Sequence, residues 1–147
     1  MRISSLTVVE MVAVIFIIAI VSAVIIMSYG NITTRGVEAD ARKIVADLCW
    51  MRQLAVAKHS NYCIRFNTNY YEIYSNSCGM PSNLLKRGNL SAILVSPSPP
   101  FDLTFNSIYG TAFSSVSVNG ILSITLTRDN RTKVVQIFEN TGYVKMQ

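Results

Sequence analysis

The side chain most at odds with its surroundings is a carboxylate, Glu10. Every residue from Met11 to Met27 is hydrophobic except Ser22, so Glu10 stands at the start of an apolar stretch. An ionised carboxylate at the edge of hydrocarbon is costly, and such residues are functional candidates by default. Glu10 is therefore the first candidate functional residue of this chain.

The chain has three cysteines, and two of them fit a disulfide. Cys63 and Cys78 lie in a region rich in Tyr, Asn and Ser that is typical of strand and loop, where a disulfide would suit an oxidising compartment. Closing a loop of this size would stabilise the fold by about 3 kcal/mol. Cys49 lies beside Trp50 in a helical pattern, and we expect it to be a buried thiol. Cys63–Cys78 is the favoured pairing of three, and reduced, buried cysteines are the alternative.

Catalytic and metal-binding chemistry has few candidates. His59 is the only histidine, and its place between Lys58 and Ser60 at an expected helix end favours a capping or surface role. A zinc site needs several Cys or His ligands at close spacing, which Cys63, Cys78 and one distant His do not supply. There is no glycine-rich phosphate loop and no serine in a nucleophile elbow. We therefore expect no enzyme activity, no cofactor and no metal.

The formal net charge of +5 is moderate. A solvated surface is the default interpretation over a nucleic-acid patch, because the basic residues are scattered rather than grouped in one run. Those beyond the helical part are Arg65, Lys86, Arg87, Arg128, Arg131, Lys133 and Lys145.

The apolar stretch is long enough for one membrane span. From Val8 to Tyr29 a helix rising about 1.5 Å per residue reaches about 30 Å. A second apolar run of that length is absent, so we expect one anchor and one small extramembrane domain. Arg2 precedes the span and residues of both signs follow it, so charge alone leaves the orientation open.

An amphipathic helix is predicted after the span, over residues 30–61. Gly30-Asn31 and Gly36 are weak points for a helix, and we expect a flexible joint there within one long helix. Charged residues, Asp40 and Asp47 among them, mostly occupy the other faces. An apolar stripe then recurs at three- and four-residue steps, formed by Val37, Ala41, Ile44, Val45, Leu48, Met51 and Ala55.

From Tyr62 onward the hydrophobic period changes to two, which predicts strands. Residues 75–91 are expected to form a loop, and Pro97, Pro99 and Pro100 exclude a regular central strand there. The predicted class is α+β, a long N-terminal helix packed by its second half on an antiparallel sheet within residues 62–147. The expected strands are Cys63–Phe66, Tyr70–Tyr74, Leu103–Phe105, Val116–Val118, Leu122–Thr127, Lys133–Phe138 and Tyr143–Met146.

The segment Ser5-Leu-Thr-Val-Val-Glu10, followed at once by the apolar stretch, resembles the processing motif of type IV pilins and pseudopilins. In that family a small residue, usually Gly, precedes the cut, and a hydrophobic residue, Thr, two aliphatic residues and Glu open the mature chain. The resemblance implies a leader over residues 1–5, cleavage by a prepilin peptidase between Ser5 and Leu6, and N-methylation of Leu6. Ser5 replaces the usual Gly, and the proline often found midway along the span is absent.

The resemblance also gives Glu10 a role. Cleavage would leave a charged amine on Leu6, four residues before Glu10. In a filament core of stacked helices, Glu10 of one subunit can pair with the terminal amine of its neighbour, because either charge buried alone would be costly. Such a pair would set the axial register, as a buried polar residue does in a coiled coil. A Glu facing lipid headgroups is the alternative.

The segment Ala41–His59, followed by Tyr62–Phe66, resembles the H-type minor pseudopilins of type II secretion and the FimT-like minor pilins (the GspH/FimT family). The resemblance implies a minor pseudopilin inserted once in the inner membrane, with residues 62–147 in the periplasm, and assembled into a short pseudopilus. The implied partners are other pseudopilins or pilins through residues 6–29, the prepilin peptidase, the inner-membrane assembly platform and secreted cargo.

Two alternatives stay open. A FimT-like minor type IV pilin would act in pilus assembly or DNA uptake, with a basic C-terminal region holding phosphates. That region here is Gly142–Gln147, with one Lys and no Arg. An ordinary membrane-anchored binding domain would keep its leader uncleaved.

Overall fold

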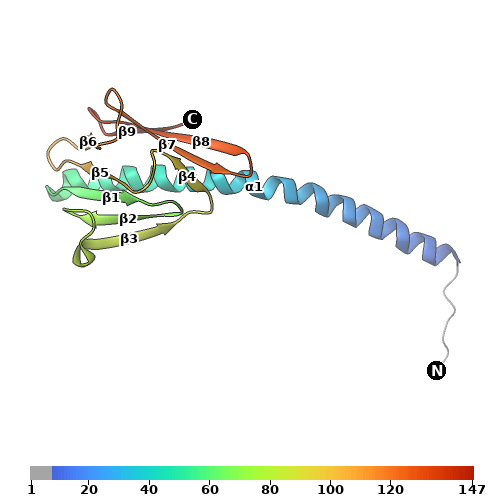
Figure 1. The fold of residues 1–147 in the computed structure, drawn as a ribbon. Coiled ribbons are helices and arrows are strands. Elements are labelled where there is room, and N and C mark those ends of the chain that lie inside the picture. The colour runs from blue at the N-terminus through green and yellow to red at the C-terminus, as the bar shows by residue number, and fades with distance from the viewer. Residues whose placement is uncertain (1–7) are drawn as a thin grey trace. The chain divides into compact units, whose positions relative to one another are not determined.

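The computed structural model of the chain describes residues 8–147, and for residues 23–35 it describes only the helical backbone. The chain divides into two compact units, an N-terminal unit (Met1–Thr34) and a C-terminal unit (Arg35–Gln147). Helix α1 (Val8–Lys58) begins in the first unit and supplies the helix of the second (Figure 1). The joint expected near Gly30 and Gly36 falls in or beside residues 23–35 and stays a prediction.

The C-terminal unit is α+β, as predicted, with all its strand pairs antiparallel. Instead of the single expected sheet, the described strands form two sheets, in the orders β3-β2-β1-β5-β6 and β4-β7-β8-β9. The elements are β1 (Tyr62–Phe66), β2 (Tyr70–Ser75), the 3₁₀ turn η1 (Pro81–Asn83), β3 (Leu84–Asn89), β4 (Ile93–Ser96), β5 (Phe101–Phe105), β6 (Ala112–Phe113), β7 (Ile121–Arg128), β8 (Arg131–Phe138) and β9 (Tyr143–Met146).

Three strand predictions need correction. The expected loop over 75–91 contains β3, whose only buried residue is Gly88, so no apolar alternation reveals the strand. Strands β4 and β6, of four and two residues, were not predicted. The expected strand Val116–Val118 is wrong, since only Val118 forms a single bridge, to Ile121. Asn119 and Gly120 both have positive φ, which makes a tight turn at that point.

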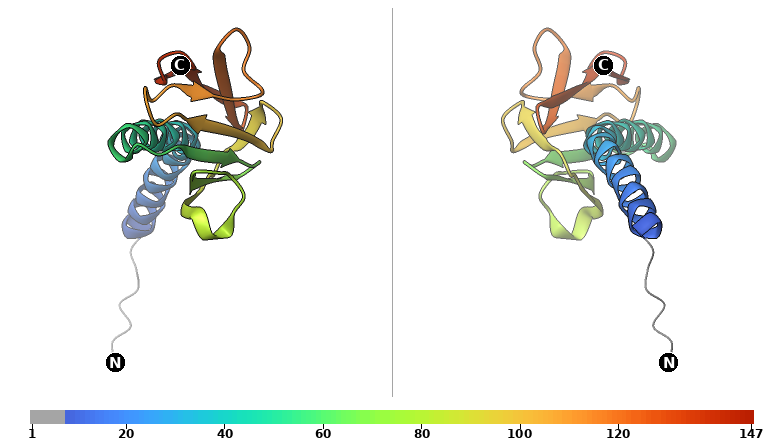
Figure 2. Two further views of the ribbon diagram at one scale, coloured as in Figure 1. Left: turned by 90° about the vertical axis from the view of Figure 1, so that its left-hand side faces the viewer. Right: turned by 90° about the vertical axis from the view of Figure 1, so that its right-hand side faces the viewer.

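The predicted apolar stripe of α1 forms the centre of the core. Its residues pack in one buried cluster with side chains from both sheets, among them Ile64 and Phe66 of β1 and Leu122, Ile124 and Val135 of β7 and β8. Figures 1 and 2 show β2 and β3 at one side of this unit and β8 and β9 at the other. The fully buried stripe residues are Val37, Ala41, Ile44, Leu48, Met51 and Ala55, and Val45 is partly buried.

Asp40 and Asp47 are buried, which corrects the expectation that they lie on solvent-facing sides of the helix. Oδ2 of Asp40 accepts three hydrogen bonds. Ser91 donates two of them, from its backbone N–H and from its side-chain hydroxyl, each at 2.7 Å, and the backbone N–H of Ala92 donates the third at 2.8 Å. These three bonds fix the connection between β3 and β4 to the helix. Since hydrogen bonds to a charged acceptor are stronger than neutral ones, they compensate the burial of the carboxylate.

Asp47 joins the helix to strands β2 and β3 of the first sheet. Its carboxylate accepts a hydrogen bond from the hydroxyl of Tyr71 at 2.5 Å and pairs with Nζ of Lys86 at 2.7 Å. Tyr71 lies across from Gly88 in the β2–β3 register. A Cβ at Gly88 would lie 2.2 Å from Cζ of Tyr71, so only glycine leaves room for the ring. Burial raises the pKa of the Tyr71 hydroxyl far above its ordinary value, and the hydrogen bond to Asp47 raises it further.

Alkaline pH should therefore destabilise the fold through Tyr71. The ordinary pKa is 10.0, and the folded pKa lies higher, so the contribution is fully present below that pH and is lost as the pH rises above it. In that range the native state holds a proton that the unfolded state has lost. The free energy of unfolding should fall by about 1.4 kcal/mol per pH unit through this group.

Denaturant unfolding of the Tyr71→Phe variant between neutral and alkaline pH measures this effect. The variant should lose this part of the slope, whereas Tyr109→Phe, at an exposed loop position, should keep it. An unchanged slope in Tyr71→Phe would contradict the role given to Tyr71.

Candidate functional site

The described part of the N-terminal unit has an apolar surface on every side of the helix. The large apolar side chains between Val8 and Val21 are between 49% and 79% exposed. The hydroxyl of Ser22 donates a hydrogen bond to the carbonyl oxygen of Ile18 at 2.7 Å, so its polar group is satisfied within the helix. A helix that is apolar all round is stable only when other apolar groups cover it. We call residues 8–22 the apolar helix surface.

The processing residues Ser5 and Leu6 lie outside the described residues. Glu10 lies in the first turn of α1, where the helix dipole favours a negative charge. Over the residues whose side chains are described, no helix combines the length and the apolar character needed to cross a membrane. The structure therefore places Glu10 among the apolar residues of the apolar helix surface, within its first turn.

Cys63 and Cys78, 15 positions apart in the sequence, are joined in a disulfide, with their Cα atoms 5.4 Å apart. The bond ties the loop after β2 to the start of β1. An oxygen of Asp102 and the two sulfur atoms lie within 4.8 Å of one another. Sulfur atoms joined to each other are not thiolates, so this cluster does not have the donor set of a metal site.

Arg65 and Asp102 form a two-pronged ion pair beside the disulfide. Nε and an Nη atom of Arg65 donate to the two carboxylate oxygens of Asp102, each at 2.8 Å, across the β1–β5 ladder. The hydrogen bond to Asp102 is the largest cause that raises the pKa of Arg65 above its ordinary value. Gly79, at φ +87°, passes so close that a Cβ there would lie 2.7 Å from the guanidinium. The ion pair and the disulfide thus position the loop after β2.

Two expectations about the end of the helix have different outcomes. Cys49 is exposed, so the predicted buried thiol is wrong. Leu48 takes the buried position of the stripe, and one residue further along a helix turns the side chain by about 100°. His59 is exposed and has φ 49°, directly after the last helical residue, while the N–H of Ser60 donates to the carbonyl of Ala55 at 3.3 Å. This closes the helix in the manner of a Schellman motif, a surface role.

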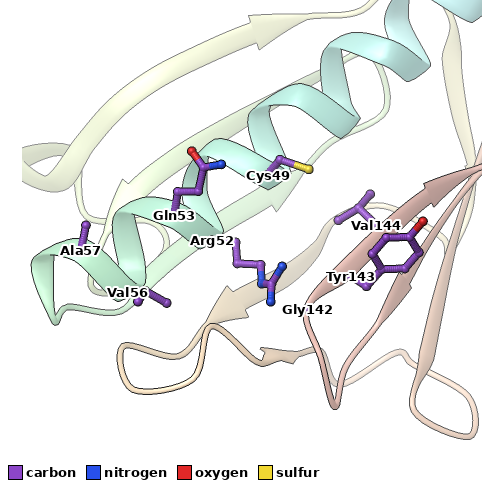
Figure 3. Close-up of a pocket in the computed structure, with 8 residues that line it drawn as sticks. All are labelled: Cys49, Arg52, Gln53, Val56, Ala57, Gly142, Tyr143 and Val144. Carbon is purple, nitrogen blue, oxygen red and sulfur yellow. The ribbon is translucent and has the colours of Figure 1, made fainter.

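A groove that the sequence did not indicate lies between α1 and β9. Its narrower part is a hollow of about 530 Å³ lined from the helix by Cys49, Arg52 and Val56 and from the strand side by Gly142 and Val144. Figure 3 shows the Arg52 side chain reaching from the helix toward Gly142, with Tyr143 and Val144 across from the helix. A second hollow of about 940 Å³ adjoins it and shares Arg52 and Tyr143. We call the two together the α1–β9 groove.

Arg52 is the central side chain of the α1–β9 groove. Its aliphatic stem passes between Gly110 and Gly142, where an added Cβ would lie 3.0 Å and 3.2 Å from it, respectively. Among the described residues, none forms a hydrogen bond or ion pair with Arg52. No sequence signal links these positions, because the three residues lie in separate parts of the chain.

Comparison with known proteins shows the fold. No protein-family model matches the chain, and no curated protein matches it. A crystal structure of the type IV minor pilin FimU of Pseudomonas aeruginosa, in space group P21, is similar with a TM-score of 0.60 and 15% identity, covering 76% of this chain and 87% of that one. A second FimU structure, in space group P65, has a TM-score of 0.59 and 16% identity, covering 75% and 91%. The fold is type IV pilin-like.

Removing the disulfide should destabilise the C-terminal unit. The double variant Cys63→Ser/Cys78→Ser should lose about 3 kcal/mol in the free energy of unfolding, because the open loop regains conformational entropy in the unfolded chain. Chemical denaturation followed by circular dichroism measures the difference. Cys49→Ser, which changes an exposed free thiol, is the matched control and should stay within about 0.5 kcal/mol of the parent. Equal stability of the double variant and the parent would contradict this role of the bond.

Proposed function

We propose that this chain is a minor, pilin-like structural subunit that assembles into a filament through its N-terminal helix. The observation that supports this most directly is the apolar helix surface, joined in one chain to a unit with the fold of a minor pilin. Other apolar helices would cover that surface in the filament core. In this proposal the chain has no enzyme activity, and its function is assembly and contact with partners.

The processing and location that we propose follow the N-terminal motif. A prepilin peptidase cuts between Ser5 and Leu6, Leu6 is N-methylated, and the subunit waits in the inner membrane with its C-terminal unit in the periplasm. The Cys63–Cys78 disulfide supports this location, because such bonds persist in oxidising compartments. The partners in this proposal are other pilin-like subunits, the prepilin peptidase and the inner-membrane assembly platform.

For the machine itself we propose the pseudopilus of a type II secretion system, on the resemblance of residues 41–66 to H-type pseudopilins. In that role the subunit contacts secreted cargo. The alternative is a minor type IV pilin, and the similarity to FimU favours it specifically. Its DNA-uptake form requires a DNA affinity that falls with salt, since phosphate contacts release counterions.

Mass spectrometry of the N-terminus tests the processing step. Co-expression with a prepilin peptidase should remove residues 1–5 and add one methyl group to Leu6, and expression without the peptidase should leave the leader in place. A Ser5→Gly variant, which restores the usual residue, should be cut at least as fast. An intact leader in assembled protein would refute the pilin-like function.

The Glu10→Ala variant tests the role of Glu10 in assembly. It should enter the membrane normally and appear in sheared filaments at roughly one tenth of the parent level or less, because the amine of the neighbouring Leu6 would be left buried without its partner. Quantitative immunoblotting of membrane and filament fractions gives both amounts. Ser22→Ala, on the same helix, is the control and should assemble as the parent does. Normal assembly of Glu10→Ala would refute the role of Glu10 in setting the register. It would not affect the conclusion on cleavage, which mass spectrometry tests separately.

A further inference from the structure

The α1–β9 groove has a positive charge that forms no ion pair with any residue the structure describes. Its described lining includes the cations Arg52 and Lys145 and contains no Asp or Glu. Arg52 is half-buried and forms no hydrogen bond or ion pair with another described residue. By contrast, four arginines of the C-terminal unit each form an ion pair with a carboxylate: Arg42, Arg65, Arg87 and Arg128. The groove is therefore complementary to a carboxylate supplied from outside the chain.

The charge is also held in place. The stem of Arg52 lies against Gly110 and Gly142, both of which have positive φ. A Cβ added to either glycine would press on the stem, at 3.0 Å and 3.2 Å respectively. A restrained arginine loses less conformational entropy when it binds a carboxylate than a freely rotating one.

The strand wall of the groove has an open backbone edge. Among the described strands, β9 pairs only with β8. Gln147 and Val134 exchange hydrogen bonds in both directions, at 2.8 Å and 3.3 Å. Alternation in an antiparallel pair then directs the N–H and C=O groups of Val144 and Met146 away from β8. These groups are available to an added strand.

The side chains around this edge suit an extended chain. Val56 on the helix is 42% exposed and Tyr143 on the strand is 55% exposed, so both offer apolar surface to alternate side chains of a bound strand. A nucleic acid could use the cations, but it has no regular row of backbone donors and acceptors to match those of β9. The open edge therefore favours a polypeptide as the occupant.

We propose that the α1–β9 groove binds an extended segment of a partner protein, which adds as a strand to the free edge of β9 and places an Asp or Glu against Arg52. This goes beyond the filament role of the apolar helix surface and does not depend on it, since it uses only residues of the C-terminal unit. It gives the subunit a docking site for acidic, strand-forming segments.

The test uses the full chain in detergent micelles and two fluorescent peptides, acetyl-Thr-Val-Thr-Glu-Thr-Val-Thr-amide and the same peptide with Gln in place of Glu. Fluorescence anisotropy should show saturable binding of the Glu peptide and affinity about tenfold lower for the Gln peptide. Arg52→Gln should reduce the affinity for the Glu peptide by about the same factor, and Arg52→Lys should restore part of it. Arg131→Gln, at the exposed tip between β7 and β8, is the matched control and should bind as the parent does.

A second variant tests the strand addition separately from the charge. Met146→Pro removes an N–H that points away from β8 and also shortens a partly buried side chain that packs on the core. Affinity for the Glu peptide should therefore fall further in Met146→Pro than in Met146→Ala, which shortens the side chain and keeps the N–H. Equal binding of the Glu and Gln peptides, or unchanged binding by Arg52→Gln, would overturn the proposal. An oligothymidylate of about twelve nucleotides that displaces the peptide and binds through Arg52 would also overturn it, in favour of a phosphate site. Circular dichroism melting of each variant shows that lost affinity is not lost folding.

Discussion

One stripe of helix α1 has to fill the space between two sheets, and the rest of the C-terminal unit depends on that contact. The small residues Ala41 and Ala55 flank the larger Ile44, Leu48 and Met51 along the stripe, and all five are fully buried. Side chains of both sheets meet in the single cluster around this stripe. Neither sheet has another helix to cover its apolar face in the described chain, so displacing the helix would expose both sheets at once.

The apolar core leaves the helix free to shift along its axis, and the two buried carboxylates remove that freedom. Asp40 binds the β3–β4 connection through three hydrogen bonds, and Asp47 binds β2 and β3 through Tyr71 and Lys86. Asp40 thus holds the segment that leads from the first sheet to the second, and Asp47 holds the first sheet. Hydrophobic burial is non-directional, whereas these bonds accept only one register. The position of the α1–β9 groove follows from this register, because it decides which helical residues face β9.

The parts of the fold that were predicted from the sequence are those in which burial alternates or recurs. Strands β7 and β8 have alternating apolar residues because one face is buried, and the stripe of α1 has a helical period for the same reason. Strand β3 gave no such signal, since its surface is exposed and its one buried position is Gly88. The burial of Asp40 and Asp47 was not predictable either, because their partners come from residues 71, 86, 91 and 92, which only the tertiary fold brings near. For the candidate sites, the pairing of Cys63 with Cys78 was favoured by local context, whereas the groove depends on the meeting of Arg52, Gly110 and Gly142.

The two aspartates also decide how the C-terminal unit responds to mechanical tension. Asp40 and Asp47 are seven residues apart, so they project from nearly the same side of the helix about 10.5 Å apart along its axis. A pull along α1 from its N-terminal side loads both contacts in shear, one to the β3–β4 connection and one to β2 and β3. The two attachments share the load because the helix between them is continuous, and the three bonds of Asp40 lie nearer to the point where the force enters. Sliding of the helix requires Asp40 to lose its three donors and Asp47 to lose Tyr71 and Lys86, so the two carboxylates together resist shear of the helix against the strands.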